Sequence, residues 1–146
     1  MCNCNSEWAQ RARNYLQQNR NNQDEKYLVI NFLLTNNKCG RNNGVFLDDL
    51  INYLESKGYL FNRENFQHQV LIPLKYQNFL ISLPYPGGIG GVFIPCNIDE
   101  VKKYYNQVLN RVYSELTNIQ NLANFSNVAN NLSDIVDLVQ EEIKNL

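Results

Sequence analysis

The sequence predicts a mostly α-helical protein with one small β-hairpin, an α+β fold, and three observations lead to this prediction. Apolar residues recur at three- and four-residue steps through most of the chain, as they do in amphipathic helices. Two short β-rich runs flank a loop rich in Gly and Pro, which is typical of a hairpin. From Ile98 onward an apolar repeat of the heptad type predicts a long helical tail.

Composition narrows the class of protein. A chain of 146 residues with 44% apolar residues can bury one core, so we expect one domain with appendages. The formal net charge is only -1, so the whole molecule does not have the strongly basic balance of many nucleic-acid binders. Residues 1–98 are mildly basic, with 9 Lys and Arg against 7 Asp and Glu, whereas residues 99–146 have 4 against 7.

The sequence also predicts where the protein resides. No stretch approaches the ~20 apolar residues that span a bilayer, and the first residues lack the charged and then apolar order of a signal peptide. We therefore expect a cytoplasmic protein with no membrane partner. Four cysteines, Cys2, Cys4, Cys39 and Cys96, are expected as reduced thiols. Because Cys2 and Cys4 form only a C-x-C pair without a second close Cys or His pair, we predict neither a metal site nor a cofactor.

The helices follow in order. Ser6 is placed as the N-cap of an amphipathic helix that extends to about Gln18, and residues 19–23 form a polar linker, so residues 1–23 are a first segment. Asp24 and Glu25 open an apolar run that we interpret as a buried helix, with Gly40 as its C-cap. A short strand at residues 45–46 precedes a helix over residues 47–57, which Gly58 ends.

The next helix and the hairpin complete this region. Asn62 offers an N-cap for a helix over residues 63–75, in which Pro73 should end or kink the regular hydrogen bonding near Gln69. Apolar runs at residues 79–83 and 92–95 then form the hairpin. Between residues 24 and 97 the order is helix, short strand, helix, helix, strand, loop and strand.

That order, together with the stretch from Gly44 to Leu50, the stretch from Asn62 to Phe66 and the Gly-rich loop from Gly87 to Gly91, resembles bacterial winged helix-turn-helix domains. The resemblance covers about half the chain. It implies a winged helix-turn-helix domain at residues 24–97, with the helix that begins after Asn62 as the DNA recognition helix. The loop from Tyr85 to Gly91, which would be the wing, contains no Lys or Arg, so insertion of this wing into a minor groove is not expected.

We expect the tail over residues 98–146 to be a dimerisation element, since a protruding apolar seam favours a symmetric pair. The seam consists of Ile98, Val101, Tyr105, Val108, Val112, Ile119 and Leu122, with Glu115 interrupting it. We expect a break at residues 124–126 and then a second stripe through Val128 or Ala129, Leu132, Ile135, Val139 and Ile143. The alternative is a helical hairpin within one chain, packed on Trp8 and Tyr15.

The predicted function is DNA binding by a homodimer, in transcription regulation or in replication or partition, without enzymatic activity. The residues expected to contact double-stranded DNA are Arg63, Asn65, Gln67, His68 and Gln69 for base edges, and Lys75, Arg41, Lys38 and Lys57 for phosphates. No catalytic residue is predicted. The alternative function is a winged-helix protein-protein interaction module without DNA contact, which the near-neutral charge favours.

Overall fold

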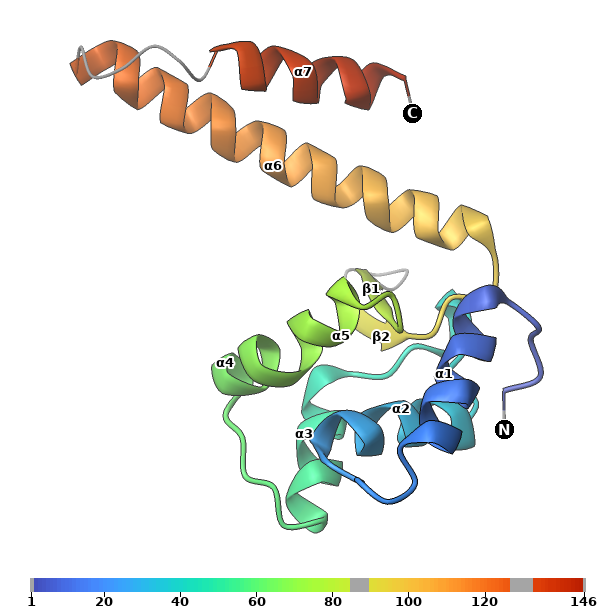
Figure 1. Ribbon diagram of the computed structural model, residues 1–146. Coiled ribbons are helices and arrows are strands. Elements are labelled where there is room, and N and C mark those ends of the chain that lie inside the picture. Colours follow the sequence, from blue (N-terminus) through green and yellow to red (C-terminus); the bar gives the residue numbers. More distant parts are fainter. Residues whose placement is uncertain (1, 85–89, 127–132, 146) are drawn as a thin grey trace. The chain divides into compact units, whose positions relative to one another are not determined.

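In the computed structural model the protein is mostly helical with one two-stranded antiparallel sheet, which confirms the predicted α+β class (Figure 1). The structure describes residues 2–84, 90–126 and 133–145. It contains two compact units, residues 1–101 and residues 102–146. The elements in chain order are α1 (Glu7–Gln18), α2 (Glu25–Thr35), η1 (Arg41–Asn43), α3 (Leu47–Ser56), α4 (Arg63–Phe66), η2 (Gln67–Leu71), α5 (Ile72–Tyr76), β1 (Ile81–Pro84), β2 (Gly90–Phe93), α6 (Ile98–Ser126) and α7 (Ser133–Lys144).

Helix α1 begins where the sequence predicted. Ser6 Oγ accepts a hydrogen bond from Ala9 N at 3.1 Å, which satisfies one of the free N–H groups of the first turn. Ala9 and Ala12 are fully buried, and such small side chains allow α1 to pack closely against α2. The N-terminal helix is therefore part of the core of the first unit.

Helix α2 ends differently from the prediction, because Gly40 is not its C-cap. Asn37 adopts the left-handed conformation at the end of the helix, with φ 57°, and Lys38 N donates to Leu33 O at 2.8 Å. Asparagine tolerates this conformation better than most residues. Gly40, with φ 86°, lies farther along the loop, and its N–H donates to Ile94 O at 2.9 Å. This bond joins the loop to the chain just after β2.

The turn after α3 agrees with the prediction. Gly58 has φ 92°, a value that glycine adopts without steric cost, and Tyr59 N donates to Leu54 O at 3.0 Å. Leu50 and Leu54 on α3 are fully buried. The helix is thus fixed against the core before the chain turns toward α4.

The sheet has the pairing of a winged-helix-like domain. Strands β1 and β2 pair antiparallel, with Ser82 opposite Val92. Val45 forms an antiparallel bridge to Val92 on the other edge of β2, so β2 lies between β1 and the short strand predicted at residues 45–46. The predicted wing residues 85–89 lie outside the described part of the chain.

The second unit holds most of α6 and all of α7. Helix α6 continues through Ser126, so the break expected at residues 124–126 was predicted too early. Helix α7 runs back along α6 (Figure 1), and Tyr105 Oη donates to Glu142 Oε1 at 3.3 Å. Val128, Ala129 and Leu132 of the predicted second stripe lie outside the described residues. Within the described residues, no helix has the length and apolar character needed to span a membrane.

The expectation of four reduced thiols was wrong for one pair. Cys2 and Cys39 form a disulfide that joins residues 37 positions apart, whereas Cys4 and Cys96 are free. Burial, a hydrogen bond that the Cys96 thiol donates to Cys4 and the nearby Glu100 charge raise the pKa of the Cys96 thiol to about 12. Sequence spacing alone did not reveal this pair, because the two residues meet only through the tertiary fold.

Candidate nucleic-acid interface

The predicted recognition helix is one continuous helical run made of α4, η2 and α5. It begins at the expected cap, where Asn62 Oδ1 accepts a hydrogen bond from Asn65 N at 2.7 Å. It ends after Tyr76, where Asn78 takes a positive φ of 62° and Phe79 N donates to Leu74 O at 3.1 Å. Helices commonly begin at such an N-cap and end at a residue in the left-handed conformation.

Pro73 changes the hydrogen bonding of this run without ending it. Residues 67–71 are π-helical, and Ile72 N donates to Gln67 O, five residues back. The changed register accommodates a residue that has no N–H to donate. The predicted disturbance near Gln69 is therefore present as a π segment, and helical structure continues to Tyr76.

Apolar side chains fix which side of the run faces the core. Phe66, Val70 and Leu74 are fully buried, and Leu71 is nearly so. Phe61, in the connection before α4, packs edge-on against Phe66, with 6.1 Å between the ring centroids. Because this side is inserted into the core, the polar residues between these positions are held toward solvent.

The structure brings the five predicted base-contacting residues together on this run, and all of them are exposed: Arg63, Asn65, Gln67, His68 and Gln69. Arg63 Nε lies 3.4 Å from Asp48 Oδ1 of α3, in an ion pair whose side chains are 69% and 66% exposed. Such an exposed pair contributes little to stability, roughly 0–1 kcal/mol. Asp48 does offset the Arg63 charge, which sits at the positive end of a helix dipole.

The predicted phosphate-binding residues come from four different segments. Lys75 lies in α5, in the last part of the helical run from Arg63 to Tyr76, and is half-buried. Lys57 follows α3, and its ammonium group lies 5.6 Å from the centre of the Tyr53 ring. Lys38 lies in the loop after α2 and is half-buried. Only Lys75 therefore lies on the same continuous helical run as the residues predicted to contact bases.

Arg41 is tied to the base of the hairpin. Its Nη2 donates to Pro84 O, at the end of β1, at 3.2 Å. Its backbone N–H donates to Glu100 Oε2, while Glu100 Oε1 accepts from Cys96 N at 2.9 Å. Arg41 Nε is buried without a hydrogen-bond partner among the described residues. The guanidinium group is thus positioned at the end of β1, just before residues 85–89.

Sequence reasoning missed two residues that shape this region, Asp48 and Glu100. Asp48 lies in the first turn of α3 and is the ion-pair partner of Arg63. Glu100 is 8% exposed, and its carboxylate accepts hydrogen bonds from the backbone N–H groups of Arg41 and Cys96. A sequence signal existed for Glu100, because Asn97 lies three residues before it, and Asn97 Oδ1 accepts from Glu100 N at 3.0 Å. This spacing is that of a helix N-cap.

The fold and the exposed helical run define a winged-helix-like α+β domain with a helical extension. Comparison with known proteins gives a relative in Methanocaldococcus jannaschii, provisionally named control protein C.MjaVP, which is 48% identical over 124 residues. The match covers 82% of this chain and 75% of the relative. The chain therefore belongs to the family of this control protein. No family model and no solved structure matches it.

Proposed function

We propose that this protein is a DNA-binding regulator of the winged helix-turn-helix type, with the run from Arg63 to Tyr76 as its recognition helix. The observation that carries the proposal is the row of exposed polar side chains on a helical run whose other side is fully buried. The name of the relative, a control protein, supports a regulatory role, and we extend that role to transcription.

The chemistry of the row suits base edges in the major groove. Asn65 and Gln69 carry amides that can make paired hydrogen bonds with adenine, and Arg63 can do the same with guanine. An α-helix fits the width of this groove, and the N-terminal residues of a recognition helix contact the bases. Arg63 and Asn65 lie in the first turn of the run, as that geometry requires.

The basic residues outside the row would contact phosphates and set the orientation of the protein. Lys75, Arg41, Lys38 and Lys57 take this role in the proposal. Because the chain has a net charge of -1, few phosphates are neutralised, and non-specific affinity should be modest. Specific contacts from the recognition helix then matter more for the total affinity.

The proposed DNA-binding form is a homodimer that pairs through α6. Ile98, Tyr105, Val112 and Ile119 are spaced by seven residues, and all remain exposed, from 38% for Val112 to 55% for Ile98. Leu122 adds a fifth apolar side chain that is 66% exposed. Apolar positions at heptad spacing favour pairing with an identical helix, because the same seam is then covered on both copies.

A charge-insertion experiment tests the dimer. We expect Val112→Glu combined with Ile119→Glu to convert a dimer into a monomer, since both charges would be buried in the pair. The matched control is Ser114→Glu combined with Asn121→Glu, which adds two charges with the same spacing at exposed polar positions of α6. Molar mass from light scattering is the measurement. A monomeric wild-type protein, or equal effects of both variants, would reject pairing through this seam.

DNA binding is tested by fluorescence anisotropy of the full chain, first with a mixed pool of short duplexes at low salt and then with sequences enriched from that pool. We expect Asn65→Ala and Gln69→Ala each to weaken the free energy of binding to the enriched sequence by roughly 1–3 kcal/mol. The salt dependence of binding should stay unchanged. Lys75→Ala should weaken binding to all sequences alike. It should also reduce the slope of log affinity against log salt concentration by about 1.

The role of Arg63 in DNA binding is tested with a matched control, Arg20→Ala, and with a change of its ion-pair partner, Asp48→Asn. Arg20→Ala removes the same charge as Arg63→Ala, but Arg20 is exposed in the loop after α1, so only Arg63→Ala should weaken binding markedly. Asp48→Asn removes the anion that pairs with Arg63 and should strengthen binding at low salt. If the protein binds no duplex at low salt, the DNA proposal fails.

A second function has its own support. Leu60 and Tyr76 are 79% and 82% exposed, and large apolar side chains at the ends of a helix-turn-helix suit contact with another protein. In this alternative the domain is a protein-protein interaction module. It predicts that Leu60→Ala and Tyr76→Ala abolish partner capture, whereas Asn65→Ala and Gln69→Ala have no effect.

A further inference from the structure

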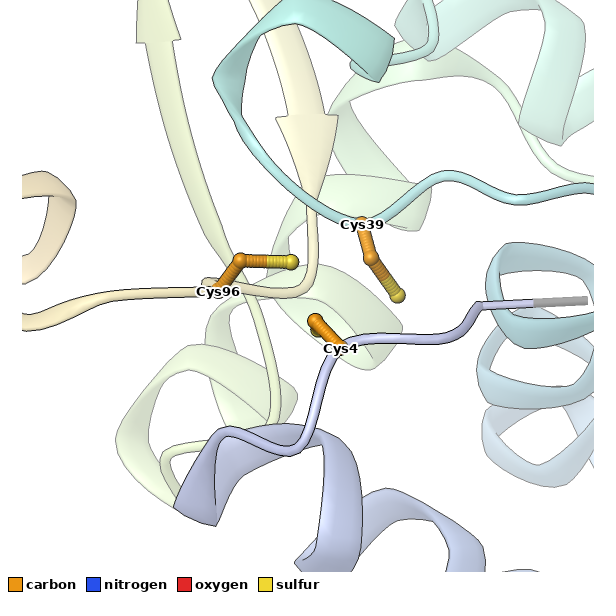
Figure 2. A group of neighbouring side chains, drawn as sticks. All are labelled: Cys4, Cys39 and Cys96. Atoms are coloured by element: carbon orange, nitrogen blue, oxygen red, sulfur yellow. The ribbon is translucent and has the colours of Figure 1, made fainter.

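All four cysteines of the chain gather at one place in the first unit. Cys2 and Cys4 precede α1, Cys39 lies in the loop after α2, and Cys96 follows β2. The Sγ atoms of Cys4, Cys39 and Cys96 all lie within 4.8 Å of one another, and Cys2 Sγ is bonded to Cys39 Sγ. Figure 2 shows the side chains of Cys4, Cys39 and Cys96 converging from three separate segments. Three segments that are distant in sequence thus bring their sulfur atoms together.

Hydrogen bonds that involve no sulfur hold these segments in place. Arg13 Nη2 donates to Cys2 O at 2.8 Å and to Cys4 O at 2.9 Å. Ser6 Oγ donates to Pro95 O at 2.6 Å, which joins the N-terminal segment to the chain beside Cys96. The positions of Cys2, Cys4 and Cys96 are therefore supported by bonds other than the disulfide. Such a preformed set is what a structural metal ion needs.

The disulfide uses only two of the four sulfur atoms. Cys4 and Cys96 are free and half-buried beside it, so reduction of the disulfide would leave four thiols around one point. A tetrahedral Zn²⁺ ion with bonds of about 2.3 Å to sulfur places its ligands about 3.8 Å apart. The 4.8 Å limit on the three sulfur atoms is close to this spacing, and small side-chain rotations would close the difference.

We propose that Cys2, Cys4, Cys39 and Cys96, in their reduced form, bind one divalent ion of the zinc class through four thiolates. Thiolate sulfur is the preferred ligand of zinc in structural sites of this composition. The proposal is independent of the proposed DNA binding. It differs from the prediction made from spacing, in which the C-x-C pair lacked a second pair of ligands, because the tertiary fold supplies Cys39 and Cys96.

The chemical steps balance with a dithiol as the reductant. The dithiol transfers two electrons and two protons to the Cys2–Cys39 disulfide, whose S–S bond breaks, and is itself oxidised to a disulfide. The four thiols then release four protons to water as four sulfur-metal bonds form. Four thiolates and one divalent ion carry two net negative charges. Arg13, whose guanidinium group bonds to the backbone of both Cys2 and Cys4, supplies a compensating positive charge next to them.

An ion at this point would connect the start of the chain, the loop after α2 and the chain that leads into α6. It would take over the constraint that the disulfide supplies in the oxidised protein. Because the ion binds the folded state and not the unfolded chain, the melting temperature of the reduced protein should rise when the ion is added. The oxidised protein should melt at the same temperature with and without it.

The test is a titration of the reduced full chain with cobalt(II) chloride under anaerobic conditions, followed by zinc(II) chloride. We expect one cobalt ion per chain, with the visible absorption of tetrahedral cobalt thiolate, and displacement of that ion by zinc. Cys4→Ser and Cys96→Ser should each weaken zinc binding by more than the roughly 10- to 100-fold that loss of an outer partner of a ligand costs. Neither residue belongs to the disulfide, so the fold of both variants can be checked by circular dichroism before reduction.

Two controls separate this site from other ligands. His68→Ala removes the chain's one histidine and should leave the cobalt signal intact. The oxidised wild-type protein should give no thiolate absorption. The proposal is overturned if the reduced wild-type chain binds no ion, if folded Cys4→Ser binds zinc as tightly as the wild type, or if mild reoxidation of a metal-treated sample yields a second disulfide between Cys4 and Cys96 at the same rate as without metal.

Discussion

Replacing Phe66 with alanine should lower the free energy of unfolding by about 3–5 kcal/mol. The Phe66 side chain lies on the core-facing side of the helical run from Arg63 to Tyr76 and is fully buried, and its ring packs against Phe61. Removing the ring takes away its transfer free energy and leaves a cavity that neighbouring side chains fill only in part. Since small domains have total stabilities of about 5–15 kcal/mol, this loss is large enough to populate unfolded molecules. Urea denaturation of the full chain, followed by circular dichroism, measures it.

Leu60→Ala is the matched control for this prediction. Leu60 is also a large apolar residue and lies just before the same helical run, but it is 79% exposed, so its truncation should change stability by less than about 0.5 kcal/mol. The difference between the two variants isolates the contribution of burial. A loss below about 1 kcal/mol for Phe66→Ala would contradict the assignment of Phe66 to the core.

The same variant also informs the proposed function. Phe66 makes no direct contact with DNA in the proposal, but it fixes which side of the helix faces solvent. If the variant remains folded at low temperature yet binds DNA weakly, the defect lies in the orientation of the polar row. Asn65→Ala, which removes an exposed side chain, should instead weaken DNA binding while leaving stability nearly unchanged.

The helices and the hairpin could be predicted because they depend on neighbouring residues. Ser6 and Asn62 cap the helices that they were predicted to cap, and Gly58 takes the positive φ expected of it. Each of these features needs only a few consecutive residues, so the sequence contains the whole cause. The predicted C-cap of α2 was wrong, because the loop after this helix contains two residues, Asn37 and Gly40, that could adopt a positive φ. Both do so in the structure, Asn37 at the end of the helix and Gly40 farther along, where its N–H donates to Ile94 O.

The candidate sites could be predicted only in part. The five residues predicted to contact bases lie together because they occupy one helical run, where periodicity decides which positions are buried. The partner of Arg63 was missed, since Asp48 lies on another helix and the two meet only through the packing of α3 against α4. The cysteine cluster was missed for the same physical reason. Its members approach one another across the tertiary fold, and no local spacing rule describes that approach.

Replacing Glu100 with alanine is the second change with a large expected effect, a loss of roughly 2–4 kcal/mol in the free energy of unfolding. Glu100 is 8% exposed, and its two carboxylate oxygens accept hydrogen bonds from the backbone N–H groups of Cys96 and Arg41. Alanine would leave both donors without this acceptor in a largely dry environment. Glu100→Gln keeps one acceptor oxygen and places an NH₂ group against the second N–H, so it should lose less than alanine but more than an exposed substitution.

Asp99→Ala is the control that separates hydrogen bonding from the helix dipole. Asp99 and Glu100 are adjacent acidic residues in the first turn of α6, where negative charge is favourable, but Asp99 is exposed. If Glu100 acts through its hydrogen bonds, Asp99→Ala should cost at most about 1 kcal/mol, well below the cost of Glu100→Ala. Equal losses in urea denaturation would mean that the carboxylate acts only as a charge near the helix start. In that case the link from α6 to the loop that carries Arg41 contributes little to the fold.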